Sequence, residues 1–285
     1  MLLLTYAINP LLMIALPIVL GLVLAARLKA SWRLFFIGAV TFIASQIGHL
    51  PFNALLENGL HISKLPLAVY AVILGLSAGV FEEVARYLVY RFWIKDARHW
   101  SQALMFGAGH GGVEAVIVGA LAALGAINIL VLSQRDLNTL GLPADQLTLV
   151  QEQMAVALSY PWWYPLLGTI ERVTAICTHL TMAVLVVQVF KRRNLLWLLA
   201  AILWHAAVDA TAVYAIGTLG AENGAVWVEI IIGLFALAGL GVIWLLREPP
   251  LKQPEVATVP LAMAAATPLT PTAPTAESLD KTRYQ

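Results

Sequence analysis

The chain has 285 residues, of which 60% are hydrophobic and only 12% are charged, and its mean hydropathy is +0.82. So little charge cannot cover the surface of a soluble domain, and the composition therefore indicates an integral membrane protein in a lipid bilayer. The net charge of +1 supplies no basic surface of the kind that binds nucleic acid. The single cysteine, Cys177, excludes an internal disulfide.

Seven segments are long and apolar enough to cross a membrane, which takes about 20 mostly apolar residues in a helix. They are residues 10–26, 34–56, 66–93, 102–132, 162–190, 195–218 and 225–246. The sequence therefore predicts an all-α fold, a polytopic membrane bundle of about seven transmembrane helices.

Basic residues gather in alternate loops, at 27–33, 91–98 and 191–193, after the first, third and fifth segments. Because cytoplasmic loops carry the excess of Lys and Arg, this pattern predicts an N-terminus outside and a C-terminus in the cytoplasm. Between the fourth and fifth segments, "PADQLTLVQEQMAVAL" repeats apolar residues at a helical period. We expect a helix there that lies along the outer membrane surface.

The chain divides into a transmembrane bundle at 1–248 and a tail at 249–285. The tail holds half of the fourteen prolines among Ala and Thr, and it has too few bulky apolar residues to form a core. Its composition predicts a disordered cytoplasmic segment.

Ten ionisable residues lie at membrane depth, where a charged side chain costs about 2.5–3.5 kcal/mol at the bilayer centre. They are Glu82, Glu83, Arg86, His110, Glu114, Glu171, Arg172, His179, His205 and Asp209. We expect these groups to face one another, or water, inside the bundle.

Four helices bring polar residues to one level. At about 1.5 Å of rise per residue, Glu82, Glu83, His110, His179 and His205 all lie roughly 12–17 Å from the cytoplasmic ends of their helices. Such a layer is hard to explain by packing alone and favours a functional site nearer the cytoplasmic half.

Glu171 and Arg172 lie farther away, about 27 Å from the cytoplasmic end. We expect a structural ion pair near the outer face there. Together with Glu114, one turn from His110, they are secondary candidates for the site.

Either Glu82 or Glu83 can pair with Arg86 along the third segment, because the spacings are four and three residues. One glutamate is left over. The pair could be a salt bridge that locks the helix to a neighbour, or the remaining glutamate could be a general base for water.

Two helices repeat one arrangement, a histidine followed four residues later by a carboxylate: His110 with Glu114, and His205 with Asp209. Residues at this spacing share a helix face. A nearby carboxylate fixes the tautomer and orientation of a histidine that binds metal or transfers protons. The glycines around His110 also allow close helix packing, but packing does not require a histidine.

In order along the chain, the motifs are "EEVAR" at 82–86, "FGAGH" at 106–110 and "HAAVD" at 205–209. This order resembles the CAAX-protease and bacteriocin-processing superfamily of intramembrane proteases, which includes the PrsW-like proteases. Within it, "GAGHGGVEA" and the "ER" before His179 are most similar to the YhfC-type intramembrane metalloproteases. The resemblance covers a protease-like core at about 66–215. Many members space the arginine one residue farther from the glutamates, and Asp209 stands where prenyl-protein endopeptidases often have asparagine.

The resemblance implies an intramembrane endopeptidase of a prokaryotic plasma membrane that cleaves a peptide or membrane protein near the cytoplasmic side. Glu82 or Glu83 would activate water while Arg86 holds the other carboxylate. His110 and His205, the latter with Asp209 beside it, would bind a divalent metal or position the water and the oxyanion.

Two versions of this mechanism remain open from the sequence. In one, His110, His179 and His205 bind a divalent metal, with zinc expected, and leave a coordination position for water. In the other, the glutamate acts without metal and the histidines support it. Two different functions are the alternatives: an ion-coupled transporter whose buried carboxylates and histidines relay protons, and a noncatalytic membrane scaffold that retains the protease fold.

Overall fold

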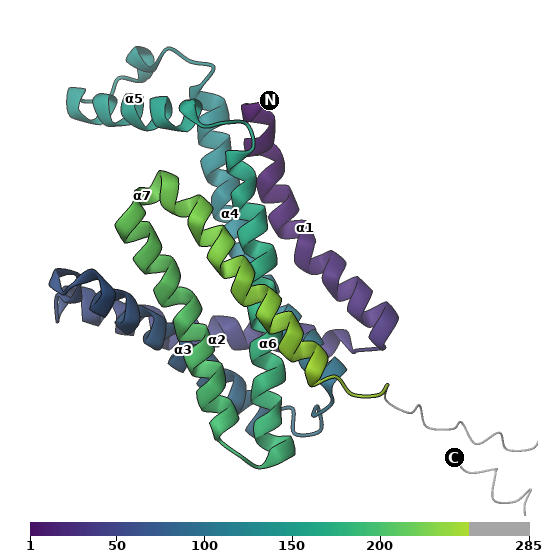
Figure 1. The fold of residues 1–285 in the computed structure, drawn as a ribbon. Helices are drawn as coiled ribbons and strands as arrows, with labels where there is room; N and C mark the ends of the chain where they lie inside the picture. Colours follow the sequence, from purple (N-terminus) through teal and green to yellow (C-terminus); the bar gives the residue numbers. More distant parts are fainter. Residues whose placement is uncertain (251–285) are drawn as a thin grey trace, which may run out of the picture. The chain divides into compact units, whose positions relative to one another are not determined.

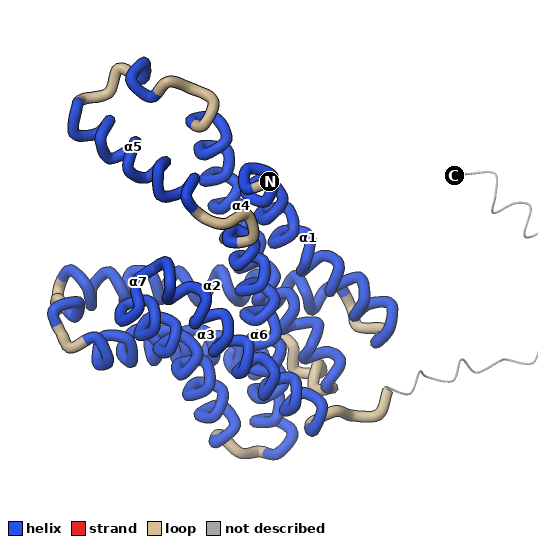
Figure 2. The backbone as a smooth tube through the Cα atoms, turned by 45° about the horizontal axis from the view of Figure 1, so that its top comes forward, coloured by secondary structure: helices blue, strands red, loops and turns tan. Residues whose placement is uncertain are grey.

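The structure, a computed structural model, describes residues 1–250 except for the side chains of residues 221–223. The predicted disordered tail at 249–285 lies outside the described residues from 251 onward. The described part of the chain is helical throughout and contains no strand (Figure 2), which confirms the predicted all-α class.

Seven helical stretches are long and apolar enough to cross a membrane, as predicted. The elements are α1 (Leu2–Leu28), α2 (Trp32–Asn58), η1 (Ile62–Lys64), α3 (Leu67–Phe92), α4 (Trp100–Leu132), η2 (Leu137–Leu140), α5 (Ala144–Ser159), η3 (Tyr164–Leu166), α6 (Leu167–Arg192) and α7 (Leu196–Leu245). In the hydrocarbon core of a bilayer there is no water to form hydrogen bonds with backbone N–H and C=O groups. A helix pairs these groups with one another. The protein is an integral membrane protein, while its orientation in the membrane remains a prediction.

The longest element, α7, is two spans joined at a sharp break, which Figure 1 shows as two arms folded back on each other. The break falls at Gly220, whose φ of 76° lies in a region that side chains other than glycine rarely adopt. The first arm is Leu196–Gly220 and the second is Gly224–Leu245, which confirms the two separate segments predicted there.

The first helix is longer than predicted, since α1 begins at Leu2 instead of residue 10 and contains Pro10 and Pro17 within it. Helices in membranes tolerate proline because neighbouring helices and polar side chains satisfy the freed backbone groups.

The central helix is α6, which packs against α4 and both arms of α7, while α1 and α2 pack on α4 and α3 packs on α7 (Figure 1). In α6, 72% of the residues in its most apolar stretch are buried, against 39% or less in the other spans. Most polar residues of α6, His179 among them, therefore face protein and not lipid.

Two glycines allow α2 and α4 to touch at the level of His110. A Cβ atom on Gly38 would lie 2.0 Å from the carbonyl oxygen of Phe106, and one on Gly109 would lie 1.8 Å from that of Phe35. Backbone atoms cannot move aside as a flexible side chain can. This close contact fixes the helix that carries His110.

The Gly109→Ala protein is expected to lose about 1–3 kcal/mol of unfolding free energy or more, because the added methyl group forces α2 and α4 apart. The matched control is Gly125→Ala on the same helix, where no heavy atom lies within 4 Å of the added Cβ. Unfolding of both purified variants in detergent would be followed by circular dichroism. Equal midpoints for the two variants would contradict this prediction.

The predicted surface segment forms α5, which lies beyond the ends of the spans near the N-terminus (Figures 1 and 2). Met154 is its only buried residue among those described. Tyr6 donates a hydrogen bond to the carbonyl of Ala157 at 2.9 Å, and Thr5 donates one to the carbonyl of Trp162 at 2.6 Å. These bonds attach α5 and the segment after it to the start of α1.

Candidate metal centre

The two adjacent glutamates of α3 have different partners. Nη1 of Arg86 donates to both carboxylate oxygens of Glu83, at 3.0 and 3.1 Å, and Nδ1 of His205 donates to the same carboxylate at 2.8 Å. Glu82 lies 3.9 Å from the nearest guanidinium nitrogen of Arg86. The sequence did not decide which glutamate pairs with Arg86. In the structure Arg86 pairs with Glu83, so the Glu82 carboxylate can bind another group.

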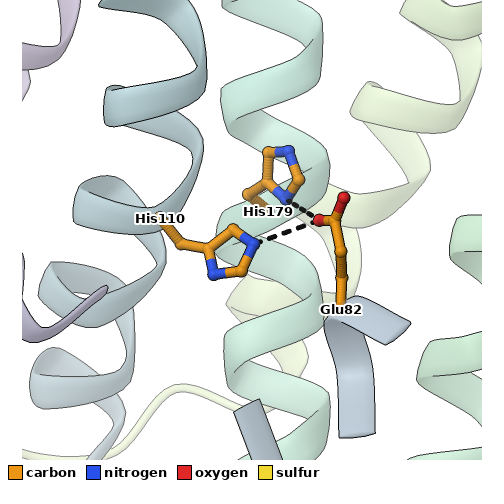
Figure 3. Close-up of side chains that lie close together, drawn as sticks. All are labelled: Glu82, His110 and His179. Carbon is orange, nitrogen blue, oxygen red and sulfur yellow. Dashed lines mark hydrogen bonds and ion pairs between the residues drawn. The ribbon is translucent and has the colours of Figure 1, made fainter. Parts of the chain in front are cut away.

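Oε2 of Glu82 faces two histidines from two other helices (Figure 3). It lies 3.0 Å from Nε2 of His110 on α4 and 4.0 Å from Nδ1 of His179 on α6. Its other oxygen, Oε1, accepts a hydrogen bond from Nε2 of Gln46 on α2 at 3.0 Å. Nε2 of His205 on the first arm of α7 also lies 4.0 Å from Oε2, so five helices meet at this carboxylate.

The group of Glu82, His110 and His179 could hold a metal ion, because one ligand atom from each lies within 4.8 Å of the others. Tetrahedral zinc with bonds of about 2.0–2.2 Å places neighbouring ligand atoms about 3.3–3.6 Å apart. The distances of 3.0 and 4.0 Å from the Glu82 oxygen bracket that value. Two histidines and one glutamate are also a ligand set that catalytic zinc sites use.

This group differs from the predicted ligands His110, His179 and His205, because Glu82 takes the place of His205. The ring of His205 is turned so that Nδ1 bonds to Glu83, while Nε2 lies 4.0 Å from Glu82 and 3.6 Å from Asp209. His205 belongs to the same cluster, as predicted, and its Nε2 is as far from Oε2 of Glu82 as Nδ1 of His179 is, but it is not one of the three residues whose ligand atoms converge within 4.8 Å.

His179 is held on both ring nitrogens. Nη2 of Arg86 lies 2.6 Å from Nδ1, and a guanidinium can only donate, so Nδ1 accepts. The proton is then assigned to Nε2, which donates to Glu114 at 2.5 Å. A metal ion on Nδ1 would take the lone pair that Arg86 uses, so metal binding and this hydrogen bond exclude each other.

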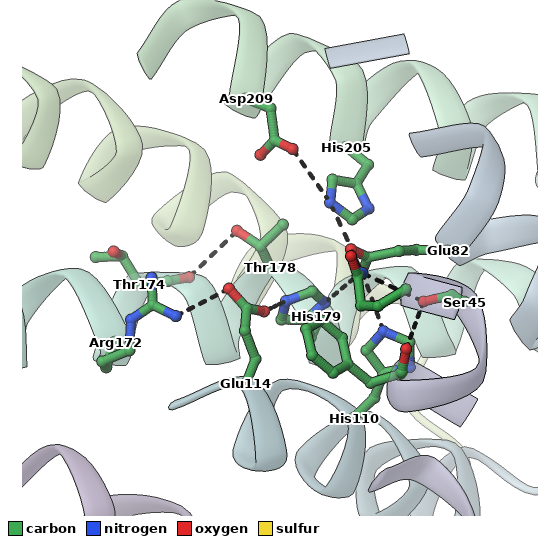
Figure 4. A network of polar contacts seen from close by, with 12 residues as sticks. Ser45, Glu82, His110, Glu114, Arg172, Thr174, Thr178, His179, His205 and Asp209 are labelled. Atoms are coloured by element: carbon green, nitrogen blue, oxygen red, sulfur yellow. Dashed lines mark hydrogen bonds and ion pairs between the residues drawn. The ribbon is translucent and has the colours of Figure 1, made fainter. Parts of the chain in front are cut away.

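Glu171 and Arg172 form the predicted ion pair, but the pair is not separate from the cluster. Arg172 pairs with Glu171, but its Nη1 also donates to Glu114 at 2.8 Å, and Glu114 is the partner of His179. Arg172 and His179 are seven residues apart in α6, so they lie on one face of the helix, two turns from each other. The Glu114 carboxylate lies between Arg172 and His179 and contacts both, as Figure 4 shows.

A cavity of about 140 Å³ lies beside the cluster, between α4, α6 and the two arms of α7. Its walls include Glu82, Glu114, Glu171, Thr178, His179, His205, Asp209 and Ile232. Figure 4 shows Asp209 and His205 on one side of His179 and Glu114 with Arg172 on the other. Water or a peptide in this cavity would meet the open side of the Glu82, His110 and His179 group.

Sequence analysis missed two features near this cluster. The first is the contact of Gln46 with Glu82, although Gln46, His49 and Asn53 share one face of α2 at spacings of three and four residues. That spacing was the available signal. The second is Glu229 in the second arm of α7, a glutamate within an apolar span whose Oε2 is buried and has no hydrogen-bond partner.

The chain is thus a helical membrane protein with seven candidate spans, in which buried glutamate and histidine side chains from different helices converge. Residues 12–232 match the family described as YhfC intramembrane metalloprotease, and the chain belongs to that family. It is 36% identical over 254 residues to the uncharacterized membrane protein YhfC of Bacillus subtilis (strain 168), covering 82% of this chain and 92% of that protein. No solved structure matches the chain.

Proposed function

We propose that this protein is an intramembrane metalloprotease that hydrolyses a peptide bond of a membrane-embedded protein or peptide. The observation that carries the proposal is the convergence of Glu82, His110 and His179, from α3, α4 and α6, on one point beside a polar cavity. The three side chains are buried, so they are not the solvated acidic clusters common on protein surfaces. The match to the metalloprotease family supports the same conclusion.

Glu82, His110 and His179 would hold a divalent metal, for which zinc is the best fit to the ligand set. A metal bound there supplies a Lewis acid and lowers the pKa of water. Glu114 accepts from Nε2 of His179 and thereby keeps Nδ1 turned toward the metal position. Arg172, bonded to Glu114, holds that carboxylate in place.

His205 and Glu83 would transfer the proton. Nδ1 of His205 donates to Glu83, which leaves Nε2 free to accept a proton from water at the cavity and to donate it to the leaving amine. Arg86 neutralises Glu83 throughout. Asp209, 3.6 Å from Nε2 of His205, would orient the ring on the cavity side.

The position of cleavage follows from the predicted orientation. Glu82 lies ten residues from the end of α3 at Phe92 and fifteen from its start at Leu67, or about 15 and 22 Å along the helix axis. With the basic loops in the cytoplasm, cleavage takes place inside the membrane and nearer its cytoplasmic side.

Metal content distinguishes the ligands in the structure from those predicted by sequence. We expect near-stoichiometric zinc in the wild-type protein, gently purified in detergent. It is lost in His110→Ala and His179→Ala, which remove ligands, and retained in His205→Ala, which does not. Plasma mass spectrometry after gel filtration gives the metal content of each folded variant. Zinc lost with His205→Ala but retained with His179→Ala would contradict the ligand assignment.

A further inference from the structure

A line of hydrogen bonds runs along α2 and ends on Glu82. The hydroxyl of Ser77 on α3 donates to Oδ1 of Asn53 at 2.7 Å. Asn53 Nδ2 lies 3.0 Å from Nε2 of His49, and Nδ1 of His49 lies 3.1 Å from Oε1 of Gln46. Nε2 of Gln46 then lies 3.0 Å from Oε1 of Glu82.

Every donor in this line points toward Glu82. An ionised carboxylate only accepts, so the amide nitrogen of Gln46 must face Glu82 and its oxygen must face His49. Nδ1 of His49 therefore carries the proton, and Nε2 accepts from Asn53. The donor and acceptor assigned for each bond agree with those of the next bond. One choice of amide orientations and histidine tautomer therefore satisfies all four hydrogen bonds.

The ring of His49 is fixed from the side as well. It stacks on Phe81 of α3, with ring centroids 5.5 Å apart and planes inclined by 28°, and the side chain is buried. Phe81 directly precedes Glu82 in the chain. The position of His49, and through it that of Gln46, is thus set by the same helix that carries the carboxylate.

The bond from Gln46 fixes the rotation of the Glu82 carboxylate about its terminal torsion. The terminal torsion of a glutamate is broad and roughly two-fold, so the carboxylate alone has no strong preference. With Oε1 held by Gln46, Oε2 is the atom directed at His110 and His179. Without it, the carboxylate can rotate away from them.

We propose that Gln46 and His49 are positioning residues for Glu82, which hold its carboxylate with one oxygen presented to the metal. The proposal rests on the proposed function, because it takes Glu82 as a metal ligand. It assigns a role to two polar residues of α2, the buried His49 and the half-buried Gln46, that take no part in the mechanism above. A merely structural role would instead change stability and leave metal binding as it is.

The test is the affinity and spectrum of the bound metal. Wild-type, Gln46→Leu, His49→Leu and double-variant proteins would be titrated with Co²⁺, whose visible absorption reports the ligand geometry, and with Zn²⁺ against a chromophoric chelator. We expect Gln46→Leu to weaken Zn²⁺ binding about 10–100-fold, as loss of a group that orients a ligand does, and to shift the Co²⁺ bands. His49→Leu should give a smaller loss.

The double variant separates the two roles. In this proposal His49 acts on Glu82 only through Gln46. The double variant should therefore bind metal as weakly as Gln46→Leu alone, and its loss of affinity should be smaller than the sum of the two single losses. The matched control is Gln188→Leu, which removes a buried glutamine of α6 that bonds to Arg192 and not to the cluster. It should bind metal like the wild type.

Two outcomes would overturn the proposal in different ways. Metal bound tightly by the wild type, with unchanged affinity and Co²⁺ spectrum in Gln46→Leu, would overturn this inference and leave the proposed function standing. Failure of the wild type to bind either metal would overturn the proposed metal centre, and this inference with it.

Discussion

The Glu82→Gln protein is expected to lose proteolysis by a factor of at least about 10², the lower range for removing a group that acts at the reacting centre. The amide has nearly the same shape as the carboxylate, so the fold should survive. It carries no charge, however, and it is a much weaker ligand for a divalent cation. Metal binding should therefore fall together with activity.

Cleavage can be measured before any substrate is known. New protein N-termini would be compared by mass spectrometry in membranes of cells that express the wild type, Glu82→Gln or Glu229→Gln. Glu229→Gln is the matched control, since it neutralises a glutamate within a span that is not among the three ligands. N-termini present with the wild type and Glu229→Gln, and absent with Glu82→Gln, identify substrates that can then be tested in proteoliposomes.

The same experiment tests the alternative functions. Identical N-termini for the wild type and Glu82→Gln would contradict the protease. If such a protein moved ions across liposomes, the transporter would be favoured. If it instead formed a stable membrane complex that survived alanine substitution of His110 and His205, the scaffold would be favoured.

The Arg86→Met protein is expected to be less stable by about 3–5 kcal/mol, the cost of breaking a buried ion pair by removing one partner. Arg86 and Glu83 are both 0% exposed, and the guanidinium bonds to both oxygens of that carboxylate. Methionine fills much of the volume but leaves the Glu83 charge without its partner.

A second variant shows whether the lost charge is the cause. Arg86→Met with Glu83→Gln removes both charges and should recover most of the lost stability, because replacing a whole buried pair is often neutral. The surface control is Arg91→Met on the same helix, where the arginine is exposed and the expected change is within about 0.5 kcal/mol. Unfolding free energies in mixed micelles give the comparison. A double variant no more stable than Arg86→Met would refute the charge explanation.

The spans could be predicted from sequence because a bilayer imposes one length on every helix that crosses it. The same constraint made the depth of each polar residue countable, and the structure brings Glu82, His110, His179 and His205 together as that count predicted. The family could be anticipated from the order of three short motifs, and the match over residues 12–232 confirms it.

Rotation about each helix axis and the reach of long side chains could not be predicted. Counting along α6 placed Arg172 too far from the layer, because an axial rise takes no account of two side chains meeting midway, as those of Arg172 and Glu114 do. The choice between Glu82 and Glu83 depends on how α3 is turned relative to His205. His205 was assigned to the metal on its level, its spacing from Asp209 and the family resemblance, none of which shows that its ring direction is set by Glu83.

The polar contacts of the cluster also determine where the bundle can part. Hydrogen bonds join α2, α3, α4, α6 and the first arm of α7, so separating any two of those partners exposes a charged or strongly polar group to hydrocarbon. The second arm of α7 faces the cavity with Ile232, an apolar side chain that lipid solvates as well as protein does. Of the helix seams around the cavity, the one beside this arm is therefore the one that can open without breaking a hydrogen bond of the cluster, although separating the arm from α6 would uncover Glu229.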